Sequence, residues 1–262
     1  MTNENVWNTV TLSRLPNRTN GKDYIDNIFD RFMELHGDRC CGDDSAIICG
    51  IAMFEGIPVT VIAQNRGKSL EDAAAHNYAM AKPEGYRKAM RVMKEAEKFN
   101  RPIIVFVDTP GADAGIESEY HGQASAIAYC LRMTSELRVP IISVLIGQGG
   151  SGGAIALALA DRVYMLENAT YSILSPEEFA NILYKDTTKA REAAKVMGIT
   201  AQDLKRKDII EDIIEEDEKG IQENPELSFD KLRIILQRDL RELREIDADE
   251  LVRRRQERFR RY

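Results

Sequence analysis

The sequence is poor in the side chains that most often bind metals or catalyse by acid and base chemistry. Among 262 residues it holds three histidines, His36, His76 and His121, which are widely separated. No His-x-x-x-His or Glu-x-x-His pair, a spacing typical of metal sites, is present. The sequence therefore predicts no metal in this chain, and each histidine is expected to be a structural or surface residue.

Cysteine is also scarce, and the four thiols form no spaced pair. Cys40 and Cys41 are adjacent, whereas Cys49 and Cys130 stand alone. This arrangement fits neither a zinc knuckle nor the disulfide framework of a small secreted domain. We therefore expect reduced thiols and a cytoplasmic protein.

Long apolar runs and an excess of basic charge are both missing. No run approaches the roughly 18 apolar residues of a membrane span, and Met1–Leu15 lacks the continuous apolar segment of a secretion signal. Lysine and arginine number 36 against 43 acidic residues, which gives a net charge of −7. Because nucleic-acid binding depends on a basic surface, neither a membrane nor a nucleic acid is expected as the main partner.

The sequence does contain an alternation of short apolar runs and amphipathic segments. The runs at 46–54 and 58–64 flank the turn signal Glu55-Gly56 and predict a hairpin. Further strands are predicted at 103–107, 140–146 and 163–166, between helices at 23–35, 83–99, 119–137, 176–183 and 189–197. Short apolar strands between helices indicate an α/β fold with a largely parallel, covered sheet.

One large domain with terminal extensions is the expected organisation. Residues 1–22 are polar and are interpreted as an N-terminal arm, 23–228 as the main domain and 229–262 as one C-terminal amphipathic helix. Leu232, Leu236, Leu240 and Leu243 form the apolar face of that helix. Because this face has no evident place in the sheet, a partner is expected to cover it.

Two glycine-rich loops follow neighbouring predicted strands. Gly147–Ala154 reads GQGGSGGA, and Asp108–Gly115 reads DTPGADAG. Peptide N–H groups without side chains can converge on an anion, and the start of a helix adds a positive end. The ends of adjacent parallel strands share one edge of the sheet, so the loops predict an anion or oxyanion site. The alternative is that the glycines only permit close packing.

The first of these loops also fits two unrelated motifs. Gly147, Gly149 and Gly152 satisfy G-x-G-x-x-G, and Glu167 follows Gly147 by twenty residues, as in a dinucleotide-binding fold. The late position of the motif and the second glycine loop argue against that interpretation. Ser151 lies in a G-x-S-x-G string, but no histidine follows His121, which excludes a hydrolase triad in the usual order.

Two basic patches are further candidates for anion binding. Arg66 and Lys68 follow the second strand, and Arg87 and Lys88 lie near the start of the helix at 83–99. Each pair could bind a carboxylate or phosphate, or could simply belong to a solvated charged face.

The order of the motifs resembles the alpha subunit of bacterial acetyl-CoA carboxylase carboxyltransferases. The resemblance runs from about Lys22 to Asp212, and Glu257–Tyr262 is similar to the short form of Gram-positive bacteria. The matching phrases are Phe32–Arg39, Asn65–Lys68, Pro83–Phe99, Asp108–Ala112, Gly147–Ala154 and Met165–Glu177. The chain differs from the family pattern at Asp113-Ala114 and Gln148, and after Ile214 it lacks a glycine-rich phrase that ends in histidine.

The resemblance implies a crotonase/ClpP-like ββα superhelix, in which 23–228 is the carboxyltransferase domain. It implies transfer of a carboxyl group from carboxybiotin on the biotin carboxyl carrier protein to acetyl-CoA, which gives malonyl-CoA in the first committed step of fatty acid synthesis. A separate beta subunit, in an alpha2beta2 complex, and biotin carboxylase are the implied partners. Biotin would not be attached to this chain.

In such a family member the biotin ureido oxygen would meet a backbone oxyanion hole. The resemblance places this hole at Gly149, Gly150, Gly152, Gly153 and Ala154, with Gly111, Ala112 and Gly115 beside it. Arg66, Lys68, Arg87 and Lys88 are the expected substrate- or biotin-binding residues. The alternatives are a carboxylase or decarboxylase acting on another acyl-CoA, a diverged scaffolding paralogue and, more distantly, a nicotinamide oxidoreductase.

Overall fold

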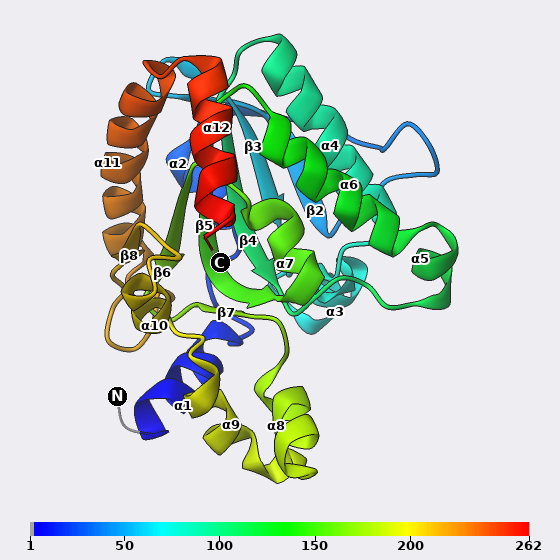
Figure 1. Ribbon diagram of the computed structural model, residues 1–262, viewed down its shortest axis with the longest axis vertical. Helices are drawn as coiled ribbons and strands as arrows, with labels where there is room; N and C mark the ends of the chain where they lie inside the picture. The colour runs from blue at the N-terminus through cyan, green and yellow to red at the C-terminus, as the bar shows by residue number, and fades with distance from the viewer. Residues whose placement is uncertain (1–2, 262) are drawn as a thin grey trace.

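The computed structural model describes residues 3–261, and its strands form one eight-stranded sheet (Figure 1). The order is β1-β2-β3-β4-β5-β6-β8, with β7 paired to β5. The β1/β2 and β2/β3 pairs are antiparallel, and all later pairs are parallel. The strands are β1 Asp30–Glu34, β2 Ile47–Phe54, β3 Ile57–Gln64, β4 Ile103–Thr109, β5 Ile141–Gly150, β6 Arg162–Leu166, β7 Thr170–Ser172 and β8 Asp212–Ile214.

Helices cover both faces of this sheet. On one face α4, α6 and α7 lie over the strands, and α2 and α11 cover the other (Figure 1). The α-helices are α1 Asn3–Ser13, α2 Gly21–Ile28, α3 Leu70–Ala75, α4 Pro83–Lys98, α5 Ile116–Tyr120, α6 Gln123–Glu136, α7 Ser151–Ala158, α8 Pro176–Tyr184, α9 Ala190–Met197, α10 Ala201–Arg206, α11 Pro225–Arg244 and α12 Ala248–Phe259. Within residues 3–261, no helix is both long and apolar enough to cross a bilayer.

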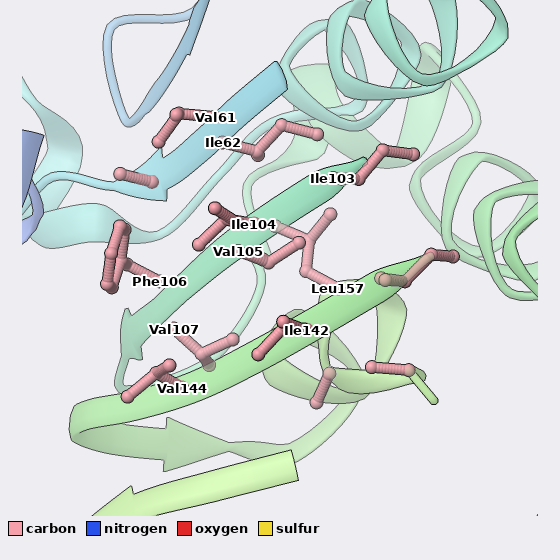
Figure 2. Packing of buried hydrophobic residues seen from close by; sticks show 14 of the residues in the cluster. Val61, Ile62, Ile103, Ile104, Val105, Phe106, Val107, Ile142, Val144 and Leu157 are labelled. Carbon is pink, nitrogen blue, oxygen red and sulfur yellow. The ribbon is translucent and has the colours of Figure 1, made fainter. Parts of the chain in front are cut away.

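Consecutive apolar residues form the central strands because both faces of the sheet are covered. All seven residues of β4 are buried, and its side chains alternate between the two helical layers (Figure 2). On one face Tyr24 of α2 stacks on Phe106 with a centroid distance of 5.0 Å. Phe229 of α11 meets the edge of Tyr24 at 5.1 Å. On the other face Leu157 of α7 joins the core.

The predicted hairpin and the strands at 103–107, 140–146 and 163–166 are confirmed. The predicted helix at 23–35 is wrong in its second half, because α2 ends at Ile28 and Asp30–Glu34 forms strand β1. Met33 pairs with Ile51, so contact with a distant strand overrides the helical spacing of Ile25, Ile28, Phe29 and Phe32. The predicted helix at 119–137 is divided at Gly122, whose φ of 84° is left-handed.

The N-terminal segment is more than a polar arm. Residues Asn3–Ser13 form α1, and its buried Val6 and Val10 pack with Ala194 and Ile199. In Figure 1 this helix lies beside α8 and α9, which extend away from the sheet. The N-terminal segment is therefore packed against a part of the chain that is about 190 residues away.

The C-terminal region is two helices, not one. Helix α11 ends at Arg244 and α12 begins at Ala248, with Asp247 as its N-cap. The leucine face of α11 is buried in the core of this chain: Leu232, Leu236 and Leu240 are fully buried. The expectation that a partner covers this face is therefore wrong, and deletion of α11 would open the core.

Arg255 connects α12 to the rest of the molecule through a buried ion pair and hydrogen bonds. Its buried guanidinium forms an ion pair with Asp161 at 2.7 Å, and both side chains are almost fully shielded from solvent. The remaining N–H groups donate to the carbonyl oxygens of Thr134, Leu137 and Val139. One side chain therefore joins α12 to the end of α6 and to the start of β5.

Candidate functional site

The two glycine loops lie against each other at the ends of β4 and β5. The glycine-rich sequence is not all loop, because Gly147–Gly150 continues strand β5 and pairs with β7 before α7 begins. A Cβ atom on Gly150 would lie 2.0 Å from the carbonyl oxygen of Pro110. A Cβ atom on Gly153 would lie 2.5 Å from the backbone nitrogen of Ala112. The shared crevice predicted from the sequence thus requires glycine at both positions.

Helix α7 starts in this crevice without a side-chain cap. Gly150 occupies the N-cap position, and no side-chain hydrogen bond caps the helix. The first N–H groups of a helix have no intrahelical partner and mark its positive end. Ser151, the first residue of α7, has a φ of 48° and is exposed. The crevice therefore presents backbone donors suited to an oxygen anion.

Gln64 of β3 fixes the two loops relative to each other. Its buried side-chain amide donates to the carbonyl oxygen of Gly153 at 3.0 Å, and its side-chain oxygen accepts from the N–H of Asp108 at 2.9 Å. Tyr86 of α4 also donates to the Gly153 carbonyl, at 3.4 Å. Burial raises the pKa of Tyr86 far above its usual value, so the phenol stays a neutral donor.

Arg66 has a positioning role at this edge of the sheet. Its guanidinium binds the carboxylate of Asp108 at 2.6 Å, and its Nη2 also donates to the carbonyl oxygen of Ser13. The same carboxylate accepts from the N–H of Gln148 at 2.8 Å. Arg66 is therefore linked to the glycine loop through Asp108, and its Nε and Nη2 donors are engaged within the chain.

The other predicted basic residues and Gly115 lie away from the helix start. Lys68 is exposed and pairs with Asp23. Arg87 is paired with Asp38 and Glu84, and the buried Lys88 is paired with Asp43. Gly115 is the exposed N-cap of α5. None of these residues lines the two hollows beside Ser151, so the structure does not bring them to the glycine loop.

The first hollow beside the glycine loop has a volume of about 320 Å³. Its walls include the strand end Gln148–Gly150, Ser151 and Pro110. Arg14, which directly follows α1, supplies a cation to the lining and binds Glu177 at 2.7 Å. This hydrogen bond lowers the pKa of Glu177. The sequence interpretation missed Arg14 because it treated residues 1–22 as an arm.

A second, apolar hollow of about 740 Å³ begins on the other side of Ser151. Gly152 and Ile155 of α7 line it, together with Phe179 of α8 and Val196 of α9. Ile173, which borders both hollows, is 82% exposed. No histidine appears among the described residues that line either hollow, although Glu178 lines the first hollow and Lys207 the second.

The described members of the predicted oxyanion hole thus have different surroundings. Gly149 and Gly150 line the first hollow and Gly152 the second. Gly153 and Ala154 are buried, with Gly153 packed beneath Gly111 and Ala112. The donors most open to a ligand are therefore those at the very start of α7.

A buried ion pair supports the strand that leads into the site. Arg18 donates through Nε to the carbonyl oxygen of Ile146 and forms a bidentate pair with Glu216. Both charged side chains are fully buried. Burial alone would lower the pKa of Arg18, but the Glu216 carboxylate outweighs it, and the pKa is raised. The local sequence does not predict this ion pair, because Arg18 and Glu216 lie 198 residues apart.

Comparison with known proteins gives consistent relatives over the whole chain. The family model described as "Acetyl co-enzyme A carboxylase carboxyltransferase-like" matches residues 1–262. The acetyl-coenzyme A carboxylase carboxyl transferase subunit alpha of Clostridium botulinum is 51% identical over 254 residues, which cover 97% of this chain and 93% of that protein. A Clostridium tetani protein named as subunits beta/alpha is 49% identical, and the match covers 97% of this chain but 44% of that longer protein.

Solved structures with the same fold share little sequence with this chain. The transcarboxylase 12S structure has a TM-score of 0.68 at 21% identity and covers 83% of this chain and 41% of the other. A Pseudomonas malonate decarboxylase hetero-dimer has a TM-score of 0.67 at 20% identity, with 84% and 90% covered. These likenesses concern the fold alone, and they confirm the expected crotonase-like architecture.

Proposed function

The chain belongs to the acetyl-CoA carboxylase carboxyltransferase-like family, and we propose that it is the alpha subunit of a biotin-dependent carboxyltransferase. With a beta subunit it transfers the carboxyl group of carboxybiotin to acetyl-CoA and forms malonyl-CoA, the first committed step of fatty acid synthesis. The observation that carries this proposal is the uncapped start of α7, packed against the Pro110–Ala112 loop.

The chemistry needs stabilisation of an oxygen anion more than it needs titrating side chains. When bound, carboxybiotin would release its carboxyl group as CO2 and leave a ureido anion that removes the acetyl methyl proton, and the resulting enolate carbon would form the new bond to that CO2. Backbone N–H groups at the start of α7 would stabilise the ureido oxygen, since fixed donors at a developing charge need no rearrangement. Gln64 and Asp108 hold the two loops in register. The scarcity of histidine is consistent with a reaction in which the ureido anion is the base and the protein supplies backbone donors.

The partner subunit belongs on the open side of this crevice. The apolar hollow next to Gly152 and the exposed Ile173 and Val196 form a surface that a second subunit could cover. In the Clostridium tetani relative, beta and alpha subunits form one chain. We place the beta subunit here, in an alpha2beta2 complex that receives biotin from the biotin carboxyl carrier protein after biotin carboxylase has acted. The free cysteines agree with a cytoplasmic location.

The purified chain is expected to show no carboxyl transfer by itself. Residues 3–261 form a single eight-stranded sheet with donors for one anion, and a second carboxyltransferase half to bind acetyl-CoA would come from the beta subunit. The measurement is the formation of malonyl-CoA from carboxybiotin and acetyl-CoA, for the chain alone and after co-expression with a beta subunit from a species with a close relative. A homomer that turns over acetyl-CoA at the rate of the complex would refute the proposal.

Ser151 deserves a direct test because its left-handed φ resembles that of a nucleophile elbow. Replacing Ser151 with alanine is expected to change carboxyl transfer by less than about tenfold, because the proposed transfer uses no nucleophilic hydroxyl and the backbone donors remain. Transfer is measured in a complex of normal size. Loss of all turnover in this variant would favour a hydrolase-like nucleophile and would contradict the transferase mechanism.

A further inference from the structure

The first hollow has one wall within the sheet and one wall outside it. Gln148–Gly150 ends β5 and is paired with β7, which ends at Ser172. The outer wall is formed by the connection 173–175 and by Pro176 and Glu178 of α8. The distance between this outer wall and the backbone donors of α7 therefore depends on contacts made outside the sheet.

The residue that follows α1 makes such a contact with the outer wall. Arg14 lines the hollow, and its Nη1 and Nη2 atoms donate to the two carboxylate oxygens of Glu177 at 2.7 and 3.1 Å. A bidentate pair of this kind restricts the relative direction of two side chains as well as their distance. Glu177 lies in the first turn of α8, next to Pro176 of the wall. The pair therefore ties the start of α8 to the end of α1.

Hydrogen bonds also connect the end of α1 to the strand that carries the glycines. Nη2 of Arg66 donates to the carbonyl oxygen of Ser13, the last residue of α1, at 3.0 Å. The same guanidinium binds Asp108, whose carboxylate accepts from the N–H of Gln148 at 2.8 Å. Because Ser13 and Arg14 are adjacent, one continuous series of polar contacts runs from the end of β5 to the outer wall of the hollow.

We propose that Arg14 is a positioning residue for the biotin side of the reaction, an inference that rests on the proposed function. Through Glu177 it holds the outer wall at the distance from α7 at which the bicyclic ring of biotin fits with its ureido oxygen on the backbone donors. It also balances the charge of Glu177 beside a site for an anion. Without Arg14, the carboxylates of Glu177 and Glu178 would both oppose the ureido anion.

The exposure of this ion pair favours positioning over a contribution to stability. The side chains of Arg14 and Glu177 are 32% and 40% exposed. Ion pairs with this much solvent around them contribute little to the free energy of unfolding. Removal of Arg14 is therefore expected to leave the chain folded, while the outer wall loses its fixed place.

The test compares Arg14→Met with the unchanged chain, each assembled with a beta subunit. Transfer is measured in the reverse direction, in which free biotin accepts the carboxyl group of malonyl-CoA. The KM for biotin is expected to rise on the order of tenfold, because the wall contacts the ring in the ground state and the transition state alike. The KM for malonyl-CoA and kcat are expected to change by less than about twofold. A general loss of structure would not separate the two substrates in this way.

Three further variants show whether the ion pair is the cause. The double exchange Arg14→Glu with Glu177→Arg restores a pair of opposite polarity and is expected to recover most of the KM for biotin. Arg14→Lys keeps the charge but cannot bind both oxygens in the same planar geometry, so an intermediate KM is expected. Arg132→Met is the matched control: it breaks an exposed pair with Glu136 on α6 and should leave both KM values unchanged.

A second measurement does not depend on catalysis. Backbone hydrogen exchange of the full-length chain is expected to become faster at 173–178 in Arg14→Met, and to stay unchanged in the buried strand β4. An unchanged complex without biotin-dependent transfer would contradict the proposed function, and this role of Arg14 with it. With an active complex, the role of Arg14 alone is overturned if Arg14→Met keeps the original KM for biotin, if the double exchange recovers nothing, or if exchange at 173–178 does not change.

Discussion

Replacing Gly150 or Gly153 with alanine is expected to abolish most carboxyl transfer and to destabilise the chain, whereas Gly152→Ala should leave both nearly unchanged. A methyl group at Gly150 or Gly153 would lie within 2.6 Å of backbone atoms of the Pro110–Ala112 loop, which cannot simply rotate away. At Gly152 the nearest atom is the side chain of Ile127, at 3.5 Å. Overpacking of this kind typically costs about 1–3 kcal/mol, and loss of one oxyanion donor costs on the order of 100-fold in rate.

The three glycine variants are compared by urea unfolding of the chain and by transfer in the assembled complex. Because a Cβ atom on Gly153 would meet the backbone nitrogen of Ala112 at 2.5 Å, a larger residue at Gly153 should disturb folding as well as transfer. Gly152→Ala controls for the added methyl group itself. If Gly150→Ala and Gly153→Ala unfold and turn over like the unchanged chain, the two loops do not meet as described.

Replacing Arg255 with methionine is expected to lower the free energy of unfolding by about 3–5 kcal/mol, because it leaves the buried Asp161 carboxylate without its partner. Three carbonyl oxygens would lose their donor at the same time. The neighbouring Arg254 is exposed and binds only Glu250 on the surface. Arg254→Met should therefore leave the unfolding midpoint almost unchanged, since surface ion pairs contribute little.

Urea unfolding followed by circular dichroism measures both arginine variants. Asp161→Asn combined with Arg255→Met tests the cause, because removal of both charges should recover part of the loss. Equal midpoints for Arg255→Met and Arg254→Met would mean that α12 is held by its apolar contacts and not by the buried charge.

The strands were predictable because burial on both faces leaves a local signal. β4 begins with the five apolar residues 103–107 that predicted it, and it continues through two buried polar residues, Asp108 and Thr109. The helix predicted at 23–35 was wrong in its second half because the local signal there does not reflect the strand pairing that decides the structure. The apolar spacing there continues past Ile28, but Met33 pairs with Ile51, and only the distant strand decides between helix and strand.

The meeting of the two glycine loops was also predictable, since adjacent parallel strands end at one edge of the sheet. The basic residues around them were not. Arg66, Arg87 and Lys88 each bind a carboxylate far along the chain, and local charge cannot reveal such a partner. Gln64 was missed for the same reason, because its two hydrogen bonds reach residues that follow it by 44 and 89 positions.

The uncapped start of α7 has a practical consequence for mutagenesis. Its donors belong to the main chain, so no exchange of one side chain for another deletes them, except an exchange to proline, which would also disturb the backbone. A complete alanine scan would register the residues that keep the peptide groups in place, such as Gln64, Gly150 and Gly153, and not the donors themselves. An amide-to-ester replacement at the first residues of α7 could be introduced by chemical synthesis or by translation with hydroxy acids. It would replace one backbone N–H donor by an oxygen atom and leave every side chain intact.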